Sequence, residues 1–233
     1  MTRPTFQTAL IVGAGAGLSG SLARLFAGQG LNVALASRQP DRLADLATET
    51  GAKSFTCDVS QADQVETLFA EVDDTVGVPD LVVFNPSARS RGPIVDIVPA
   101  DVERALAVTA YGGFLVGQQA ARRMVANNQG AILFTGASAS VKGYPQSAPF
   151  AMGKFALRGL AQSMARELGP KGVHVAHFVI DGGILPPGRE QSADRPDSML
   201  HPDAIAETYW QVARQDRSAW TWEVELRPWV ESF

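Results

Sequence analysis

Phe150 and Lys154 lie four residues apart in the segment APFAMGKFALRGLAQSMAREL, which has the apolar spacing of an amphipathic helix. Side chains at this spacing share one face of a helix, so the two residues are neighbours. A tyrosine at position 150 would form with Lys154 a pair able to supply a proton during catalysis. Phenylalanine has no titratable group, so any proton transfer at this position needs another donor.

The second feature with chemical potential is the glycine-rich stretch VGAGAGLSG, residues 12–20, between an apolar run and a helical pattern. Glycines in this context let the backbone approach a pyrophosphate, whose charge the helix N-terminus favours. Two registers fit: Gly15-x-Gly17-x-x-Gly20 has the GxGxxG spacing, and Gly13-x-x-x-Gly17 begins at the strand end. The stretch predicts a dinucleotide site. Its predicted contacts are Gly13, Ala16, Gly17 and Leu18.

The residue type at the end of the second apolar run bears on the choice of cofactor. An acid about 20 residues beyond the loop would bind the ribose 2′-hydroxyl, whereas an arginine accommodates a 2′-phosphate. Here the position is Ser37, followed by Arg38. This favours NADP(H) over NAD(H), and the alternative is that Arg38 is a solvated surface charge.

Short apolar runs alternate with amphipathic patterns along the whole chain. Continuous apolar strands between helices predict a parallel sheet covered on both faces, in one doubly wound α/β domain over residues 1–233. A Pro-, Gly- and charge-rich loop, residues 184–200, is a candidate substrate lid. Predicted strands are 8–13, 32–37, 52–59, 80–85, 130–136, 172–180 and 219–226; predicted helices are 18–28, 40–50, 60–74 (capped by Ser60), 101–127 (broken near Gly112–Gly113), 148–168 and 202–215.

Composition excludes several classes of protein. The 233 residues carry a net charge of −4, with no basic run for nucleic acid or an acidic membrane surface. The single cysteine, Cys57, rules out an internal disulfide or a cysteine-based metal cluster, and no metal site is expected. Neither a signal-peptide pattern nor a membrane-spanning run is present, so we expect a cytoplasmic location.

In the order and spacing of these motifs, the chain resembles the short-chain dehydrogenase/reductase family over nearly its whole length. The glycine loop is similar to the family's TGxxxGxG, with Ser19 in place of the last glycine. The CDV, FNPSA and GGI segments resemble the family's aspartate-hydrophobic pair, NNAG stretch and PG-x-I segment. The resemblance implies a Rossmann-type fold with a mostly parallel seven-stranded sheet.

The same resemblance implies further cofactor contacts. Asp58 would accept a hydrogen bond from the adenine amino group, with Val59 beside the ring, and the alternative for Asp58 is a charge at a helix start. Ile184 would touch the nicotinamide carboxamide, and Lys154 would hold the ribose unless it is an ordinary surface lysine. The remaining implied contacts are Asn85, Pro86 and Gly182.

The catalytic positions depart from the family pattern. Family enzymes use a tyrosine, a lysine four residues later, a serine about thirteen residues earlier and an asparagine on the preceding long helix. Lys154 matches, whereas Phe150, Ala137 and Thr109 replace the other three. Substitute candidates lie on the loop after the fifth strand. They are Ser138 and Tyr144; the alternatives are an ordinary serine at a strand end and a tyrosine that packs the loop. Lys142 is expected to be a solvated charge. His174 and His177 are expected to be core or edge residues of a strand.

Two functions follow from this mixture. The first is an NADP(H)-dependent oxidoreductase acting on a small carbonyl or alcohol with a non-standard proton donor. The second is a catalytically inactive NADP(H)-binding protein that serves as sensor, scaffold or oligomer partner. By resemblance, a homodimer or homotetramer would form through helices 101–127 and 148–168.

Overall fold

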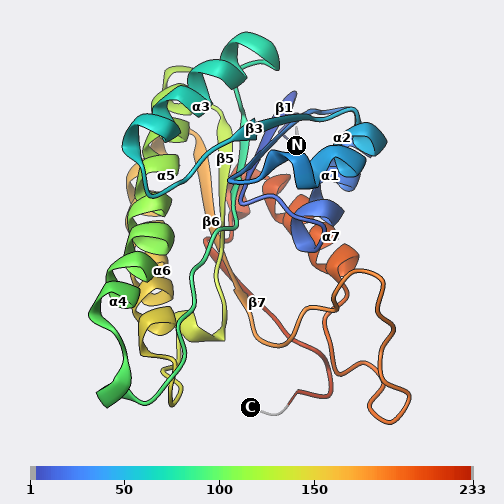
Figure 1. Cartoon of the computed structure of the whole chain (residues 1–233). Helices are drawn as coiled ribbons and strands as arrows, with labels where there is room; N and C mark the ends of the chain where they lie inside the picture. Colours follow the sequence, from blue (N-terminus) through green and yellow to red (C-terminus); the bar gives the residue numbers. More distant parts are fainter. Residues whose placement is uncertain (1–3, 232–233) are drawn as a thin grey trace.

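The apolar runs form one seven-stranded sheet in the computed structural model, which describes residues 4–231 (Figure 1). The strands are β1 (Thr8–Val12), β2 (Asn32–Ser37), β3 (Lys53–Thr56), β4 (Leu81–Phe84), β5 (Gly130–Thr135), β6 (Val173–Ile180) and β7 (Glu223–Leu226). Their order is β3-β2-β1-β4-β5-β6-β7, and every pairing is parallel. The predicted α/β fold is confirmed. The order reverses between β1 and β4, where such sheets leave a crevice at the strand carboxyl ends.

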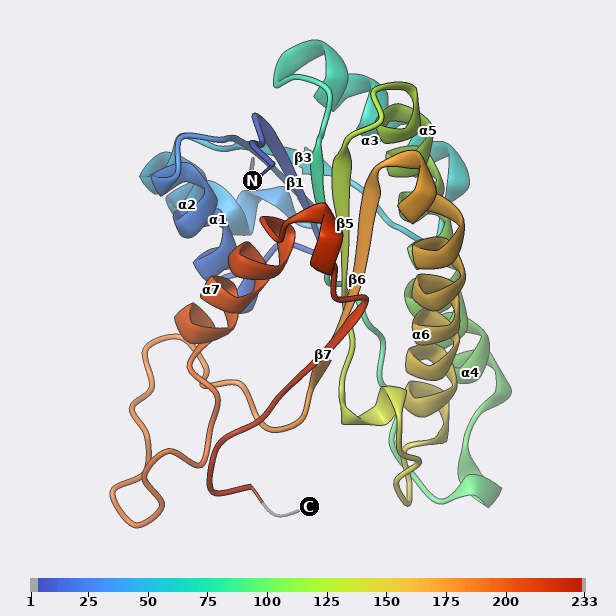
Figure 2. The same cartoon turned by 180° about the vertical axis from the view of Figure 1, so that it is seen from behind.

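Helices cover both faces of the sheet, as Figures 1 and 2 show from opposite sides. One face carries α1 (Leu18–Gly28), α2 (Ala44–Thr50) and α7 (Pro202–Ala213). On the other side lie α3 (Ala62–Thr75), α4 (Pro99–Leu106), α5 (Gly112–Ala126) and α6 (Ala148–Leu168). Within residues 4–231, each helix is too short or too polar to cross a lipid bilayer.

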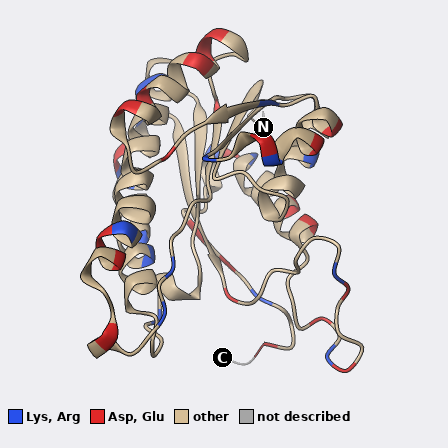
Figure 3. Ribbon diagram, viewed as in Figure 1, with Lys and Arg blue, Asp and Glu red and all other residues tan. Residues whose placement is uncertain are grey.

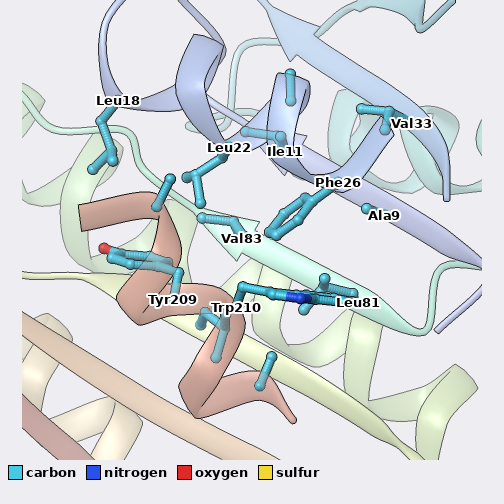
Figure 4. Packing of buried hydrophobic residues seen from close by; sticks show 14 of the residues in the cluster. Ala9, Ile11, Leu18, Leu22, Phe26, Val33, Leu81, Val83, Tyr209 and Trp210 are labelled. Carbon is cyan, nitrogen blue, oxygen red and sulfur yellow. The ribbon is translucent and has the colours of Figure 1, made fainter. Parts of the chain in front are cut away.

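The helix α7 closes the first face through aromatic packing (Figure 4). Trp210 lies against Phe26 of α1, with ring centroids 5.9 Å apart. Tyr209 stacks on Phe178 of β6, and its hydroxyl donates a 2.9 Å hydrogen bond to Thr135 Oγ1 at the end of β5. This contact fixes the strand end from which the loop carrying Ser138 and Tyr144 departs.

The predicted break near Gly112–Gly113 is wrong, because the helix continues through both glycines. The helical path is continuous, and its irregular part is a π-helical turn over Ala107–Tyr111. The glycines permit close packing: a Cβ at Gly112 would lie 2.9 Å from Val59 Cγ2, and one at Gly113 2.5 Å from Leu157 Cδ1. Side chains at these two positions would push α5 away from its neighbours.

The predicted lid forms a long loop with a closed base. Ile184 bridges Leu200, and the Leu200 N–H donates to the Gly183 carbonyl at 2.8 Å. Further along, the Gln191 side chain bonds both the N–H and the carbonyl of Met199. The loop therefore extends from a fixed base on the side of the strand ends opposite α4 and α6 (Figure 1).

Candidate active site

A pocket of about 500 Å³ lies at the carboxyl ends of β1, β2, β3 and β4. This is the edge of the sheet where the order reverses, and parallel α/β sheets bind ligands there. Many of the residues predicted to bind a cofactor meet in it. Its lining includes Gly13, Ser37, Arg38, Asp58, Val59, Asn85 and Pro86, together with Arg89 and Arg104.

A hydrogen-bonded chain shapes the turn after β1. Asn85 Nδ2 donates to Ser19 Oγ at 2.8 Å, and Ser19 Oγ donates to the Gly13 carbonyl at 3.1 Å. Gly13 has φ +78°, and a Cβ there would lie 2.8 Å from Pro86. Gly15 and Gly17 have neither a positive φ nor a heavy atom within 4 Å of such a Cβ. The backbone geometry therefore favours the register that begins at Gly13.

The first turn of α1 leaves backbone donors for an anion. Gly17 is the N-cap residue and no side chain caps the helix, nor does the first turn contain an acid. Ala16 lines a neighbouring pocket, whereas Leu18 is buried in the core. Free N–H groups and the helix dipole together suit a phosphate.

Asp58 lies at the pocket wall and is not a helix cap. Its Oδ1 accepts hydrogen bonds from the N–H of Ser60, at 3.0 Å, and from Ser60 Oγ, at 2.7 Å. These bonds, together with the Arg38 charge, lower the pKa of the Asp58 carboxyl. The predicted Ser60 cap is wrong, because α3 begins after Gln61 and Ser60 bonds backwards to Asp58.

Two arginines surround the end of β2. A pocket of about 420 Å³ is lined by Ser37, Arg38 and Arg42, together with Ala16 of the glycine loop. A guanidinium can donate two parallel hydrogen bonds to a phosphate, and neither Asp nor Glu lines this pocket. The surroundings of Ser37 thus suit a phosphate better than a ribose hydroxyl.

Lys154 is buried, with 2% of its surface exposed, and its Nζ donates to the Thr135 carbonyl at 2.6 Å. Burial, reinforced by the Arg89 charge, lowers the pKa of Lys154 to about 7. It lines neither the 500 Å³ pocket nor the one at β2. The alternative of an exposed surface lysine is therefore wrong, and its contact with a ribose stays a prediction.

The buried lysine predicts a specific pH dependence of stability. Between about 7 and the ordinary value of 10.5, the unfolded chain binds more protons than the folded protein at Lys154. Stability relative to a Lys154→Met variant should therefore rise over this window, by at most about 1.4 kcal/mol per pH unit. Urea unfolding at about pH 7 and about pH 9 measures it. The exposed Lys171→Met variant is the control, and parallel curves for wild type and Lys154→Met would contradict the prediction.

A smaller pocket of about 350 Å³ adjoins Phe150. Ser138 and Tyr144, the two predicted substitute donors, both line it with Phe150. Phe150 is 6% exposed and packs against Ala137 and Ala139. The structure thus places both predicted substitute donors beside Phe150.

Thr109 connects the π-helical turn to the loop after β4. It is 1% exposed, and its Oγ1 accepts a 3.3 Å hydrogen bond from the Ala88 N–H. A Cβ at Gly153 of α6 would lie 3.0 Å from Thr109 Cβ. Thr109 therefore holds the pocket wall in place, and π-helical turns are frequent at functional sites.

The end of β6 lies apart from the large pocket. Gly182 has φ +152° beside Pro228, and Ile184 packs on the first core cluster; neither lines that pocket. Asp181 pairs with Arg227 at 2.8 Å and with Lys142 at 3.8 Å. Lys142 is exposed, as predicted for a solvated charge, and it also has an acidic partner in Asp181.

The two strand histidines are structural, as predicted. His174 stacks on Trp220 and bonds the Thr221 carbonyl, and His177 bonds Glu223 at 3.0 Å. Burial lowers the pKa of His177 to about 4. No group of three or more His, Cys, Asp or Glu side chains suited to a metal ion occurs within residues 4–231.

Sequence reasoning missed Arg89. Its guanidinium carbon lies 4.0 Å from the centroid of the Phe150 ring, and Lys154 Nζ lies 5.9 Å from the same centroid. The available signal was a cation four residues beyond Asn85, on the loop after β4. Arg89 lines both the large pocket and the one beside Phe150, so it joins the two parts of the site.

The chain is similar to known proteins over most of its length. Residues 7–194 match the family model described as short chain dehydrogenase. The mitochondrial borneol dehydrogenase of Lavandula x intermedia is 30% identical over 72% of this chain, and the match spans 66% of the length of that protein. Two crystal structures share the fold. A short-chain dehydrogenase from Rhodopseudomonas palustris is 35% identical with a TM-score of 0.83, and the match covers 97% of this chain and 100% of that one. A metagenomic short-chain oxidoreductase in complex with NADP is 26% identical with a TM-score of 0.83, and the match covers 97% of this chain and 98% of that one. The chain belongs to the short-chain dehydrogenase family.

Proposed function

We propose that this protein is an NADP(H)-dependent oxidoreductase acting on a small carbonyl compound or the corresponding alcohol. The observation that carries the proposal is the pocket at the reversal of strand order, with Gly13, Arg38, Asp58 and Asn85 in its wall. Its relatives include a borneol dehydrogenase and a short-chain oxidoreductase crystallised with NADP. When bound, the cofactor supplies or accepts a hydride at nicotinamide C4.

The chain's residues would divide the binding of the cofactor among them. The α1 N-terminus and the turn at Gly13 would hold the pyrophosphate, and Arg38 with Arg42 the 2′-phosphate. Asp58 keeps Oδ2 free of the Ser60 hydrogen bonds and would accept from the adenine amino group. Lys154, whose Nζ lies 5.9 Å from the centroid of the Phe150 ring, would bind the ribose, and the phosphates would stabilise its charge.

The proton would come from the loop after β5. When a carbonyl carbon gains a hydride, its oxygen needs a proton or a stabilising positive charge as the alkoxide develops. Tyr144 has a hydroxyl at the pocket beside Phe150 and would donate the proton, and Ser138 would donate a hydrogen bond to the carbonyl. In alcohol oxidation the same hydroxyl would take the proton back.

The first test is cofactor binding. We expect NADPH to bind at least about tenfold more tightly than NADH, because the two arginines interact with the added phosphate. Arg38→Leu should abolish this preference, whereas Arg166→Leu, which removes an exposed charge at the far end of α6, should preserve it. Isothermal titration measures both. Equal affinities in the wild type would contradict the NADP(H) preference, and failure to bind either nucleotide would contradict the whole proposal.

Turnover separates the oxidoreductase from its alternative. The inactive NADP(H)-binding protein is favoured by one observation, the lack of a titratable group on Phe150. A panel of aldehydes and ketones decides between the two. Oxidation of NADPH is measured as the loss of absorbance at about 340 nm, where the reduced nicotinamide absorbs. Tight NADPH binding without turnover across the panel would favour the inactive protein.

We also propose a homodimer or homotetramer built on α5 and α6. Both helices expose apolar side chains: Tyr111 and Phe114 lie at and just after the π-helical turn, and Met152 and Phe155 on α6. The rings of Tyr111 and Phe114 stack on each other on the surface. Exposed aromatic and methionine side chains are enriched at the centres of protein interfaces.

A further inference from the structure

The pocket beside Phe150 is rich in positive charge. Its wall takes Arg89 and Arg91 from the loop after β4, and Ser138 and Tyr144 from the loop after β5. Figure 3 shows Lys and Arg colour on the connection between β4 and α4. Neither an aspartate nor a glutamate is among the residues that line the pocket. The wall therefore combines two cations with the hydroxyl groups of Ser138, Tyr144 and Ser147.

The two arginines lack acidic partners. Within residues 4–231, neither guanidinium forms an ion pair or a hydrogen bond with a carboxylate. Among the acids that follow in the chain, Asp101 is already bonded to Ser90 and Arg104. The exposed Asp96 is not paired with either arginine in the described residues. Both side chains are exposed, and partial desolvation, followed by repulsion from the Arg91 charge, lowers the pKa of Arg89. An anion between them would relieve this repulsion.

The guanidinium of Arg89 lies over the ring of Phe150. The guanidinium carbon lies 4.0 Å from the centroid of a ring that is itself 6% exposed. A guanidinium stacked on an aromatic ring keeps its N–H groups in its own plane, where they remain available to a planar carboxylate or a phosphate. The phenylalanine at position 150 thus provides a platform for a cation next to the proposed reaction site.

We propose that the substrate of this protein is anionic: a carbonyl compound, or its alcohol, that carries a carboxylate or phosphate bound by Arg89 and Arg91. Its carbonyl lies toward Ser138 and Tyr144 in the same pocket. The carbonyl part of this proposal rests on the proposed function, whereas the anionic part rests on the unpaired arginines. Carboxylate and phosphate share the oxyanion chemistry that two guanidinium groups recognise.

Matched pairs of compounds test the anion directly. Acetoacetate is compared with methyl acetoacetate, and dihydroxyacetone phosphate with dihydroxyacetone. In one of the two pairs, we expect kcat/KM with NADPH to be at least about tenfold higher for the anionic member than for the neutral one. Which pair shows this difference tells whether the site binds a carboxylate or a phosphate. Binding of each compound to the protein–NADP⁺ complex by calorimetry gives a readout that does not need turnover.

Arg91→Met is the informative variant, because Arg91 lines the pocket beside Phe150 and not the large one, whereas Arg89 lines both. We expect it to remove the preference for the anion through a higher KM, with NADPH affinity unchanged. Arg166→Met, a loss of the same charge on the exposed part of α6, is the control and should keep the preference. Circular dichroism confirms that both variants fold.

The outcomes separate the two proposals. Turnover of neutral and anionic members with equal efficiency, or an anion preference that survives Arg91→Met, would overturn the anionic substrate while leaving the oxidoreductase in place. Anion binding that is lost in Arg91→Met, without turnover of any compound, would support the anion site and contradict the oxidoreductase. Failure of every compound to bind or react would overturn the anionic substrate.

Discussion

Replacing Phe150 by tyrosine is expected to raise kcat/KM for carbonyl reduction by about 10²-fold, the lower end of what general acid catalysis contributes. The ring already lines the pocket shared by Ser138 and Tyr144, so an added hydroxyl would face the substrate. Lys154 lies one helical turn further along α6, and the Arg89 guanidinium lies 4.0 Å from the ring centroid. The charge of Arg89, and that of Lys154 when it is protonated, would favour the phenolate and lower the pKa of the phenol toward the pH of the reaction.

The steady-state rate of NADPH oxidation with the best compound of the panel measures this effect. Phe150→Leu is the matched control, since it changes the ring without adding a donor. A second comparison locates the native donor: Tyr144→Phe should lower the rate more than about tenfold in the native protein, and much less in the Phe150→Tyr background. A Phe150→Tyr variant no faster than wild type would show that the remaining site cannot use a donor at this position.

The second large effect is expected at Gly13, where an alanine should destabilise the protein by about 1–3 kcal/mol and weaken NADPH binding at least about tenfold. Gly13 has φ +78°, and its new Cβ would lie 2.8 Å from both the backbone nitrogen and Cγ of Pro86. A proline backbone between β4 and its loop cannot yield as a flexible side-chain tip can. Relieving the clash between the new Cβ and Pro86 would require a movement of the turn that Ser19 and Asn85 hold in place.

Gly15→Ala provides the control for stability. It lies two residues away in the same loop, without a positive φ and with open space around its hypothetical Cβ. Urea unfolding should place Gly15→Ala close to wild type and Gly13→Ala well below it. Equal stability of the two variants would contradict the role assigned to the turn at Gly13.

The sequence by itself determined the fold, because the signals for it are local. Buried parallel strands are short apolar runs, helices between them have a 3.6-residue period, and both patterns are readable without knowing what they touch. The glycine loop could be placed for the same reason, since it stands between one strand and one helix. The four-residue spacing of Phe150 and Lys154 also fixed their common helix face.

Only the tertiary structure decided what surrounds those two residues. Arg89 is 61 positions from Phe150 in the chain, so no spacing rule could place its guanidinium on the ring. Burial of Lys154 and the bond from its Nζ to Thr135 depend on how α6 packs against β5. Pockets and clusters of charged side chains form where separate helices, strands and loops come into contact. Those contacts depend on how the whole sheet packs with its helices. For that physical reason the sequence predicted where a cofactor would bind, whereas the anionic character of the proposed substrate followed only from the folded structure.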